Sequence, residues 1–164
     1  MPDMLVKLYD LPPNGSAHKK LEEKGITIRR GLPPEKHIVT EWVKSHFNAH
    51  WSSECEAAFA RQPVSCLLAT KTITIDGKSS EKLIGFACYD ATAKAFFGPT
   101  GVDPAERGIG AGKALLIAAL HAMREEGYGY GIIGGAGPVQ FYSKTVGAIE
   151  IPESSPGIYR GMLK

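Results

Sequence analysis

The stretch with the most informative residue types runs from Arg107 to Lys113 and reads Arg-Gly-Ile-Gly-Ala-Gly-Lys. It lies between an apolar stretch typical of a strand and one typical of a helix. Glycine has no Cβ, so the backbone of such a loop can turn tightly and let a ligand come close. The N-terminus of the following helix adds about half a positive charge. The loop therefore predicts a bound phosphate or pyrophosphate group.

Two common phosphate-binding motifs do not fit this loop. A Walker A loop needs glycine five residues before Gly112, where Arg107 stands, and Ser or Thr after Lys113, where Ala114 stands. A dinucleotide fingerprint G-x-G-x-x-G beginning at Gly108 would end on Lys113 instead of glycine. No βαβ order precedes the loop either. The sequence thus excludes both of these nucleotide-binding motifs.

The loop fits the pattern R-x-x-G-x-G, through Arg107, Gly110 and Gly112. This pattern resembles the pyrophosphate loop of the GNAT N-acetyltransferase superfamily, which binds acetyl-coenzyme A. A second segment, residues 140–148 (QFYSKTVGA), is similar to the family's F-Y-x-K-x-G segment, with one extra residue before the glycine. The two motifs and the chain between them cover about residues 95–149, and the preceding strands match the family's order.

The resemblance implies a coenzyme site built largely from backbone groups. In this family the fourth and fifth strands splay apart around a bulge, and their backbone binds the pantetheine arm like an added strand. Phe97–Val102 and Ile132–Gly135 are the matching stretches here. No metal ion is expected. The residues expected to bind acetyl-coenzyme A are Thr100, Gly101, Val102, Arg107, Gly108, Ile109, Gly110, Ala111, Gly112, Lys113, Gly134, Gly135, Tyr142 and Lys144.

Acetyl transfer from a thioester to an amine requires a neutral amine, a polarised carbonyl and a proton for the departing thiolate. Holding the two reactants at near-attack distance supplies much of the rate. The resemblance implies that Tyr142 donates a proton or hydrogen bond to the coenzyme sulfur. The alternative interpretation of Tyr142 is a tyrosine that only packs on the last helix.

The general base is harder to place, because family members often carry a glutamate on the fourth strand and Lys94–Val102 contains no acidic residue. Glu54 is the candidate that we select. Glu56, His50, Asp90 or a relayed water remain alternatives, since only one proton must be removed. The resemblance places the first two helices beside the acceptor, where some aromatic residues either shape a pocket or pack in the core: Trp42, Phe47, Trp51 and Phe59.

The overall composition indicates one globular domain. The chain has 164 residues, of which 43% are hydrophobic, and a net charge of +2, which gives no indication of a nucleic-acid surface. No apolar stretch reaches the ~20 residues that span a bilayer, and the N-terminus lacks the apolar core of a signal peptide. We therefore expect a cytoplasmic protein without membrane or nucleic-acid partners. Cys55, Cys66 and Cys88 lack C-x-x-C spacing and are expected to be reduced core residues.

Hydrophobic periodicity predicts an α/β (α+β) fold: a mixed, mostly antiparallel sheet of about six to seven strands, with helices on both faces. The resemblance adds that strands four and five are splayed. Residues 1–25, with a turn at Pro12–Ser16, are interpreted as an N-terminal extension that is either part of the domain or flexible. Residues 26–164 are interpreted as a single GNAT domain. The predicted helices are Glu35–His46, Ser52–Arg61, a central one from Lys113 to Glu126, and Val139–Thr145. The predicted strands are Leu5–Tyr9, Ile26–Arg30, Val64–Ile75, Lys82–Asp90, Lys94–Val102, Tyr128–Gly134, Gly147–Ile151 and Gly157–Leu163.

The function that follows is an acetyl-coenzyme A-dependent N-acetyltransferase, which moves an acetyl group to the primary amine of a small molecule by direct attack. Two alternatives stay open. One is a protein-lysine or N-terminal acetyltransferase, and the other is a non-catalytic coenzyme-A-binding regulatory module, which the missing fourth-strand acid supports. The resemblance also leaves room for a homodimer through sheet edges or the last strands.

Overall fold

Seven strands form one sheet in the order β2-β3-β4-β5-β6-β1-β7. The computed structural model describes residues 1–15 and 17–164, so Ser16 of the predicted Pro12–Ser16 turn lies outside the described residues. Strands β5 and β6 are parallel and the other neighbours are antiparallel. The mixed, mostly antiparallel sheet of the predicted size is thus confirmed. The strands are β1 (Met4–Lys7), β2 (Ile26–Arg30), β3 (Cys66–Ile75), β4 (Lys78–Tyr89), β5 (Phe96–Val102), β6 (Tyr130–Ile133) and β7 (Ile149–Glu150).

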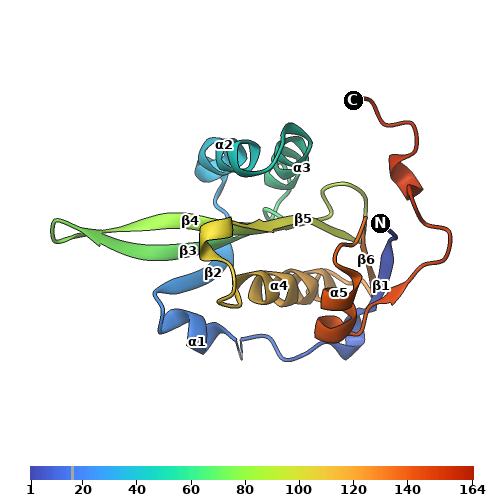
Figure 1. Ribbon diagram of the computed structural model, residues 1–164, viewed down its shortest axis with the longest axis horizontal. Coiled ribbons are helices and arrows are strands. Elements are labelled where there is room, and N and C mark those ends of the chain that lie inside the picture. Colours follow the sequence, from blue (N-terminus) through green and yellow to red (C-terminus); the bar gives the residue numbers. More distant parts are fainter. Residues whose placement is uncertain (16) are drawn as a thin grey trace.

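Helices cover both faces of this sheet, as the sequence predicts (Figure 1). Helices α2 and α3 lie on one face, and α4 and α5 lie on the other. Helix α3 begins three residues earlier than predicted, because Asn48 caps it. The helices are α1 (His18–Glu22), α2 (Lys36–His46), α3 (Ala49–Phe59), α4 (Ala111–Glu125) and α5 (Val139–Val146), and the 3-10 helices are η1 (Leu8–Asp10), η2 (Pro33–Glu35), η3 (Pro104–Glu106) and η4 (Gly157–Tyr159).

Each face of the sheet has its own hydrophobic core, and β4 supplies side chains to both. Successive residues of a strand point to opposite faces. Phe86 and Cys88 therefore pack in the cluster under α2 and α3, whereas Ala87 and Tyr89 pack in the cluster that includes α4. All four side chains are fully buried. Burial on both faces explains why this stretch is continuously apolar.

Strands β3 and β4 form the predicted hairpin. Its turn is Asp76-Gly77, shorter than the turn-rich stretch 76–80 of the sequence, and both residues have positive φ angles of 52° and 75°. Two positive φ values are the signature of the two-residue turn whose twist matches a hairpin. The hairpin extends well beyond the helical layers (Figure 1).

A bulge and a separation of strands follow in β5, where the sequence places Gly98-Pro99. Thr100 pairs with Ala87 but Phe97 pairs with Tyr89, so β5 has one more residue than β4 over this interval. The parallel ladder to β6 consists of Phe96 with Ile132 and Phe97 with Ile133, and then ends. Beyond this point the two strands diverge, which confirms the predicted splayed pair.

The two ends of the chain compare differently with the sequence-based prediction. The strand predicted at Leu5–Tyr9 is present as β1 (Met4–Lys7), which lies inside the sheet between β6 and β7. The predicted strand Gly157–Leu163 is wrong: Gly157–Tyr159 is a 3-10 helix, and the residues after it are not in a strand. The physical reason is that β1 already pairs with the edge of β6 that a last strand would need. The C-terminal residues therefore leave the sheet.

Candidate active site

The glycine loop connects β5 to α4 and adopts a conformation that requires glycine. Gly108 and Gly110 have φ angles of +85° and +93°, and Gly110 is the N-cap of α4. A Cβ at either position would meet nothing within 4 Å, so the backbone conformation and not crowding excludes other residues. The first N–H groups of α4 have no partner within the helix. With exposed Arg107 and Lys113 beside them, these groups form a site suited to an anion.

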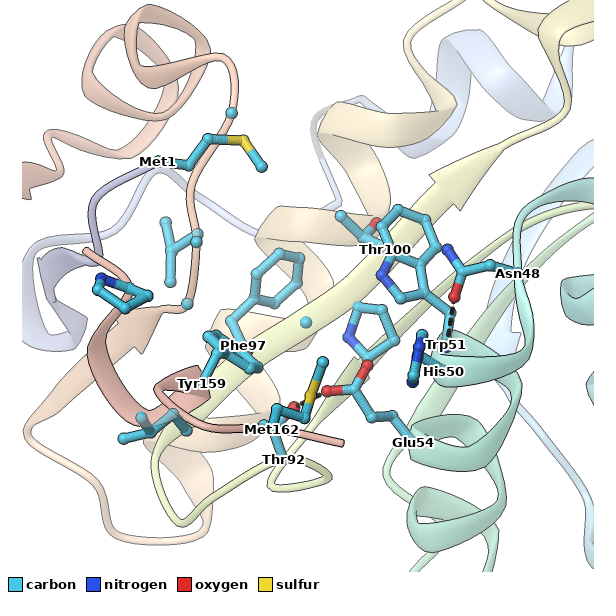
Figure 2. Close-up of a pocket in the computed structure, with 18 of the residues that line it drawn as sticks. Met1, Asn48, His50, Trp51, Glu54, Thr92, Phe97, Thr100, Tyr159 and Met162 are labelled. Carbon is cyan, nitrogen blue, oxygen red and sulfur yellow. Dashed lines mark hydrogen bonds between the residues drawn. The ribbon is translucent and has the colours of Figure 1, made fainter. Parts of the chain in front are cut away.

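A cavity of about 990 Å³ lies between α3, the diverging ends of β5 and β6, and the C-terminal segment (Figure 2). The bulge residues Gly98 and Pro99 lie in its wall. Its lining also includes Met1, Asn48, His50, Trp51, Ser53, Glu54, Thr92, Phe97, Thr100, Ile133, Gly134, Gly135, Gly137, Tyr142, Ser155, Pro156, Ile158, Tyr159 and Met162.

Glu54 is the acidic residue on this cavity. Helix α3 is oriented by its N-cap, since the Trp51 N–H donates to Asn48 Oδ1 at 2.8 Å. Glu54 follows Trp51 by three residues and His50 by four, so all three lie along one side of the helix. The Thr92 hydroxyl donates to Glu54 Oε1 at 2.6 Å and holds the carboxylate in place (Figure 2). Glu54 is thus a positioned carboxylate that borders open space.

Tyr142 reaches the same cavity from α5. Its ring packs edge-to-face against Phe97 and Phe141, with centroids 6.5 and 5.1 Å away. The side chain is buried, and burial raises the pKa of the Tyr142 phenol above its ordinary value. The hydroxyl is therefore held in its protonated form, which is the form that can donate a proton.

The structure brings some of the predicted residues to the cavity and leaves others elsewhere. Glu56 is exposed and outside the lining, as is Lys144. Asp90 accepts hydrogen bonds from the Ala95 N–H and the Tyr128 hydroxyl, so it holds a loop together. The predicted residues that line the cavity are Glu54, His50, Trp51, Thr100, Gly134, Gly135 and Tyr142.

The four aromatic residues proposed for a pocket divide between the two alternatives. Trp51 lines the cavity, whereas Phe59 is a buried member of the core under α2 and α3. Trp42 and Phe47 pack against that core and outside the lining, with Phe47 stacked at an angle on Trp51 at 5.1 Å. Only Trp51 can therefore touch a ligand in the cavity.

Some of the predicted coenzyme-binding residues already form a hydrogen bond within the protein. The Thr100 hydroxyl donates to the Phe86 carbonyl at 3.0 Å, and the Gly135 N–H donates to Asp3 Oδ1 at 2.8 Å. Gly101 is also one of the residues expected to bind the coenzyme. In the structure its close neighbour is the side chain of Phe47, the C-cap residue of α2, and a Cβ on Gly101 would collide with that ring.

Gly101→Ala is accordingly expected to lower the free energy of unfolding by about 1–3 kcal/mol, the usual cost of overpacking a core. Gly129→Ala is the control, because a Cβ at Gly129 meets nothing within 4 Å and its φ is not in the left-handed region. Urea unfolding monitored by circular dichroism measures both. Equal midpoints for the two variants would contradict the packing role of Gly101.

The cysteines are free and buried, as expected for reduced core residues. Their sulfur atoms nevertheless converge within 4.8 Å of one another, which the sequence spacing did not predict. Burial raises the pKa of the Cys88 thiol well above its ordinary value. The cluster belongs to the core under α2 and α3, outside the cavity lining, and its members pack there as small apolar side chains.

A model of the acetyltransferase (GNAT) family matches residues 36–147, from α2 through the glycine loop to the C-cap of α5. The chain belongs to the acetyltransferase (GNAT) family. A search of curated protein sequences finds no match. Within the described residues, no helix has the length and apolar character needed to cross a membrane.

Solved structures with the GNAT fold resemble this chain at low sequence identity. A GCN5-related glucosamine N-acetyltransferase region of a fungal multi-domain β-N-acetylglucosaminidase superposes with a TM-score of 0.71 at 15% identity, over 92% of this chain and 19% of that one. A GCN5-related N-acetyltransferase from Sphaerobacter thermophilus superposes with a TM-score of 0.61 at 22% sequence identity, over 92% of this chain and 48% of that one. A Drosophila protein superposes with a TM-score of 0.57 at 13% identity, over 92% of this chain and 47% of that one. This chain thus spans less than half the length of each of these proteins.

GNAT proteins use acetyl-coenzyme A, and the residues of the glycine loop in this chain are suited to bind it. The glycine loop and the N-terminus of α4, with Arg107 and Lys113, would hold the pyrophosphate. The diverging β5 and β6 leave backbone groups between the loop and the cavity. When bound, the coenzyme supplies an activated acetyl thioester.

Several cavity residues have no counterpart in the sequence-based prediction. Thr92 stands in a loop whose pairing with Glu54 joins residues 38 positions apart. Met1 and the C-terminal residues from Ser155 to Met162 reach the cavity only because β1 and β7 bring both chain ends there. The local sequence pattern in this C-terminal stretch is Pro156-Gly157, which is typical of a turn and precedes two large apolar residues. This pattern predicts a turn but not a cavity wall.

Proposed function

We propose that this GNAT protein is an acetyl-coenzyme A-dependent N-acetyltransferase that acts on the primary amine of a small molecule. The observation that carries the proposal is the meeting of Glu54 and Tyr142 in one cavity, at the point where β5 and β6 diverge. A carboxylate and a protonated phenol are the two proton-transfer groups that aminolysis of a thioester needs.

In the proposed mechanism each residue has one role. Glu54, held by Thr92, accepts the proton of the incoming ammonium and so delivers the neutral amine. As the C–N bond forms and the C–S bond breaks, Tyr142 gives its proton to the departing sulfur, and the second proton that the nitrogen loses restores the Tyr142 phenol. The walls of the cavity hold the amine at near-attack distance, which converts a bimolecular step into an effectively unimolecular one.

The size of the cavity favours a small acceptor over a protein. Its volume of about 990 Å³ lies at the upper end of the range for small-molecule sites. Met1 and the C-terminal segment wall it on the side opposite α3, where a peptide chain would need an open groove. The net charge of +2 gives no support to a polyanionic partner. We also propose a cytoplasmic location.

Calorimetry and thiol release together test this function. Calorimetry should show binding of acetyl-coenzyme A, and a coenzyme-A thiol assay should show release that depends on a small primary amine. Binding without release on any amine would identify a non-catalytic module. Acetylation of peptides but not of small amines would identify a protein acetyltransferase, and absence of coenzyme binding would overturn the proposal.

Arg107→Ala is expected to raise the Kd for coenzyme A at least about tenfold, because a hydrogen-bonded charge on a phosphate contributes ~1.5–3 kcal/mol. Arg107 is exposed in the glycine loop, and its Nε donates to the Val102 carbonyl at 3.2 Å. Arg124→Ala is the matched control, since Arg124 is exposed in the last turn of α4, at the end of the helix away from the loop. Equal affinity of wild type and Arg107→Ala would contradict the assignment of the loop.

A further inference from the structure

The residues after β7 form one wall of the cavity, and we call residues 155–162 the strap. In Figure 1 this segment (red) runs from the side of the sheet that carries α5 to the side that carries α3. Ser155, Pro156, Ile158, Tyr159 and Met162 all line the cavity. Figure 2 places Tyr159 and Met162 across the cavity from Trp51 and His50.

The strap is anchored at its base by Asp3, which is 7% exposed. The Asp3 N–H donates to Ser154 Oγ at 2.8 Å, and the Ile151 N–H donates to the Asp3 carbonyl at 2.9 Å. The Asp3 carboxylate accepts the Gly135 N–H at the end of β6. One buried residue therefore ties the beginning of the strap to the strand that borders the cavity, so the strap has a defined position.

The strap presents apolar side chains that the protein itself does not cover. Ile158 is 54% exposed and Met162 is 48% exposed, although both line the cavity. Trp51, which is partly exposed, lines the same cavity from α3, across from Met162 in Figure 2. Exposed apolar side chains gathered around a cavity mark a surface that a ligand covers.

Against this apolar wall stands one charged side chain. Of the described residues that line the cavity, Glu54 is the only one whose side chain is charged at neutral pH when histidine is neutral. Tyr159 of the strap lines the same cavity, and its hydroxyl lies 3.1 Å from the position that a Cβ on Gly134 would occupy. Burial and the negative charge of Glu54 raise the pKa of the Tyr159 phenol. The strap and the Glu54–Thr92 pair thus border the same cavity.

We infer that the strap determines acceptor specificity, and that the acceptor is a monoamine with an apolar body, such as an arylalkylamine or a branched alkylamine. Its ammonium lies at Glu54, and its hydrocarbon body lies between Trp51 and the strap residues Ile158 and Met162. This inference rests on the proposed function, because it names the substrate class of the same cavity.

The same walls disfavour other amines. An α-amino acid would bring its carboxylate next to Glu54, and like charges at short range repel. An amino sugar would place hydroxyl groups against Ile158 and Met162, where they would lose water without gaining hydrogen bonds. Acceptors of these classes should therefore bind more weakly than an apolar amine of equal size.

The test compares 2-phenylethylamine and 3-methylbutylamine with glucosamine, leucine and an N-terminal peptide in the thiol-release assay. The apolar amines should have the highest kcat/KM. Ile158→Ser combined with Met162→Ser should raise KM for 2-phenylethylamine at least about tenfold with a smaller change in kcat, since each lost apolar contact weakens binding severalfold. Leu163→Ser is the control, because Leu163 adjoins Met162, is 89% exposed and lies outside the cavity lining.

A second readout does not depend on turnover. Calorimetric titration of 2-phenylethylamine into the protein saturated with coenzyme A should show the same affinity loss in the double variant and not in Leu163→Ser. Preference for glucosamine, or an unchanged KM in the double variant, would overturn the inference and leave the N-acetyltransferase function in place. Loss of coenzyme binding in the wild type would instead overturn the function itself.

Discussion

Glu54→Gln is expected to lower kcat/KM for the amine at least 100-fold, because a positioned general base contributes roughly 10²–10⁴ to the rate. Glutamine keeps the size of the side chain and an oxygen that accepts the Thr92 hydroxyl, which bonds to Glu54 Oε1 at 2.6 Å. What the substitution removes is the ability to take a proton and the negative charge that faces an ammonium. Stopped thiol-release assays at several amine concentrations would separate the effect on kcat from that on KM.

Glu56→Gln is the control for this expectation. Glu56 stands on the same helix α3 and is exposed and outside the cavity lining, so its activity should match wild type. Coenzyme affinity should be unchanged in both variants, because the glycine loop is elsewhere. If Glu54→Gln retained activity within about threefold of wild type, the proton would have to leave through water, and Glu54 would lose its assignment as base.

Tyr142→Phe is expected to lower kcat at least about tenfold with little change in coenzyme affinity, because it removes the proton donor and keeps the ring. The ring's edge-to-face contacts with Phe97 and Phe141 remain, so the fold should be retained. Burial raises the pKa of the Tyr142 phenol above its ordinary value, and the hydroxyl therefore stays protonated through neutral and moderately alkaline pH. Wild-type kcat should accordingly not fall through ionisation of Tyr142 as the pH rises toward 10.

Tyr130→Phe controls for loss of a phenolic hydroxyl, since Tyr130 is 52% exposed and outside the cavity lining. It should match wild type in kcat and in coenzyme affinity. Unchanged turnover in Tyr142→Phe would remove Tyr142 from the role of acid and direct attention to Tyr159, the other tyrosine in the cavity.

Local features of the fold were predictable because their causes lie within a few residues. The Asp76-Gly77 turn needs two positive φ values, and Asp-Gly is a residue pair that adopts them readily, so the sequence predicts a hairpin there. The bulge in β5 follows from Gly98-Pro99, which cannot continue a regular ladder. The left-handed backbone of the loop before α4 follows from glycines placed directly before a helix. Each of these depends on backbone conformation that a short stretch of sequence specifies.

Other features depended on pairings between distant segments and could not be predicted. The strand predicted near Leu5 forms as β1, but its place between β6 and β7 could not be predicted, and neither could the absence of the strand predicted at Gly157–Leu163. Gly101 faces Phe47 because the C-cap of α2 lies against β5, a contact that no local pattern encodes. Asp90 has the residue type of a general base, but the Tyr128 hydroxyl and the Ala95 N–H occupy it.

The sequence by itself determined the family-specific coenzyme loop, the layered fold and the tyrosine on the last helix, since these rest on motifs in which spacing and conformation coincide. Only the tertiary structure decided which acid meets that tyrosine and what closes the cavity. Glu54 and the strap approach each other across more than 100 residues of chain, through a sheet that accepts β1 between β6 and β7. An acceptor site assembled from separate elements has no sequence signature, because its geometry exists only after the strands have paired.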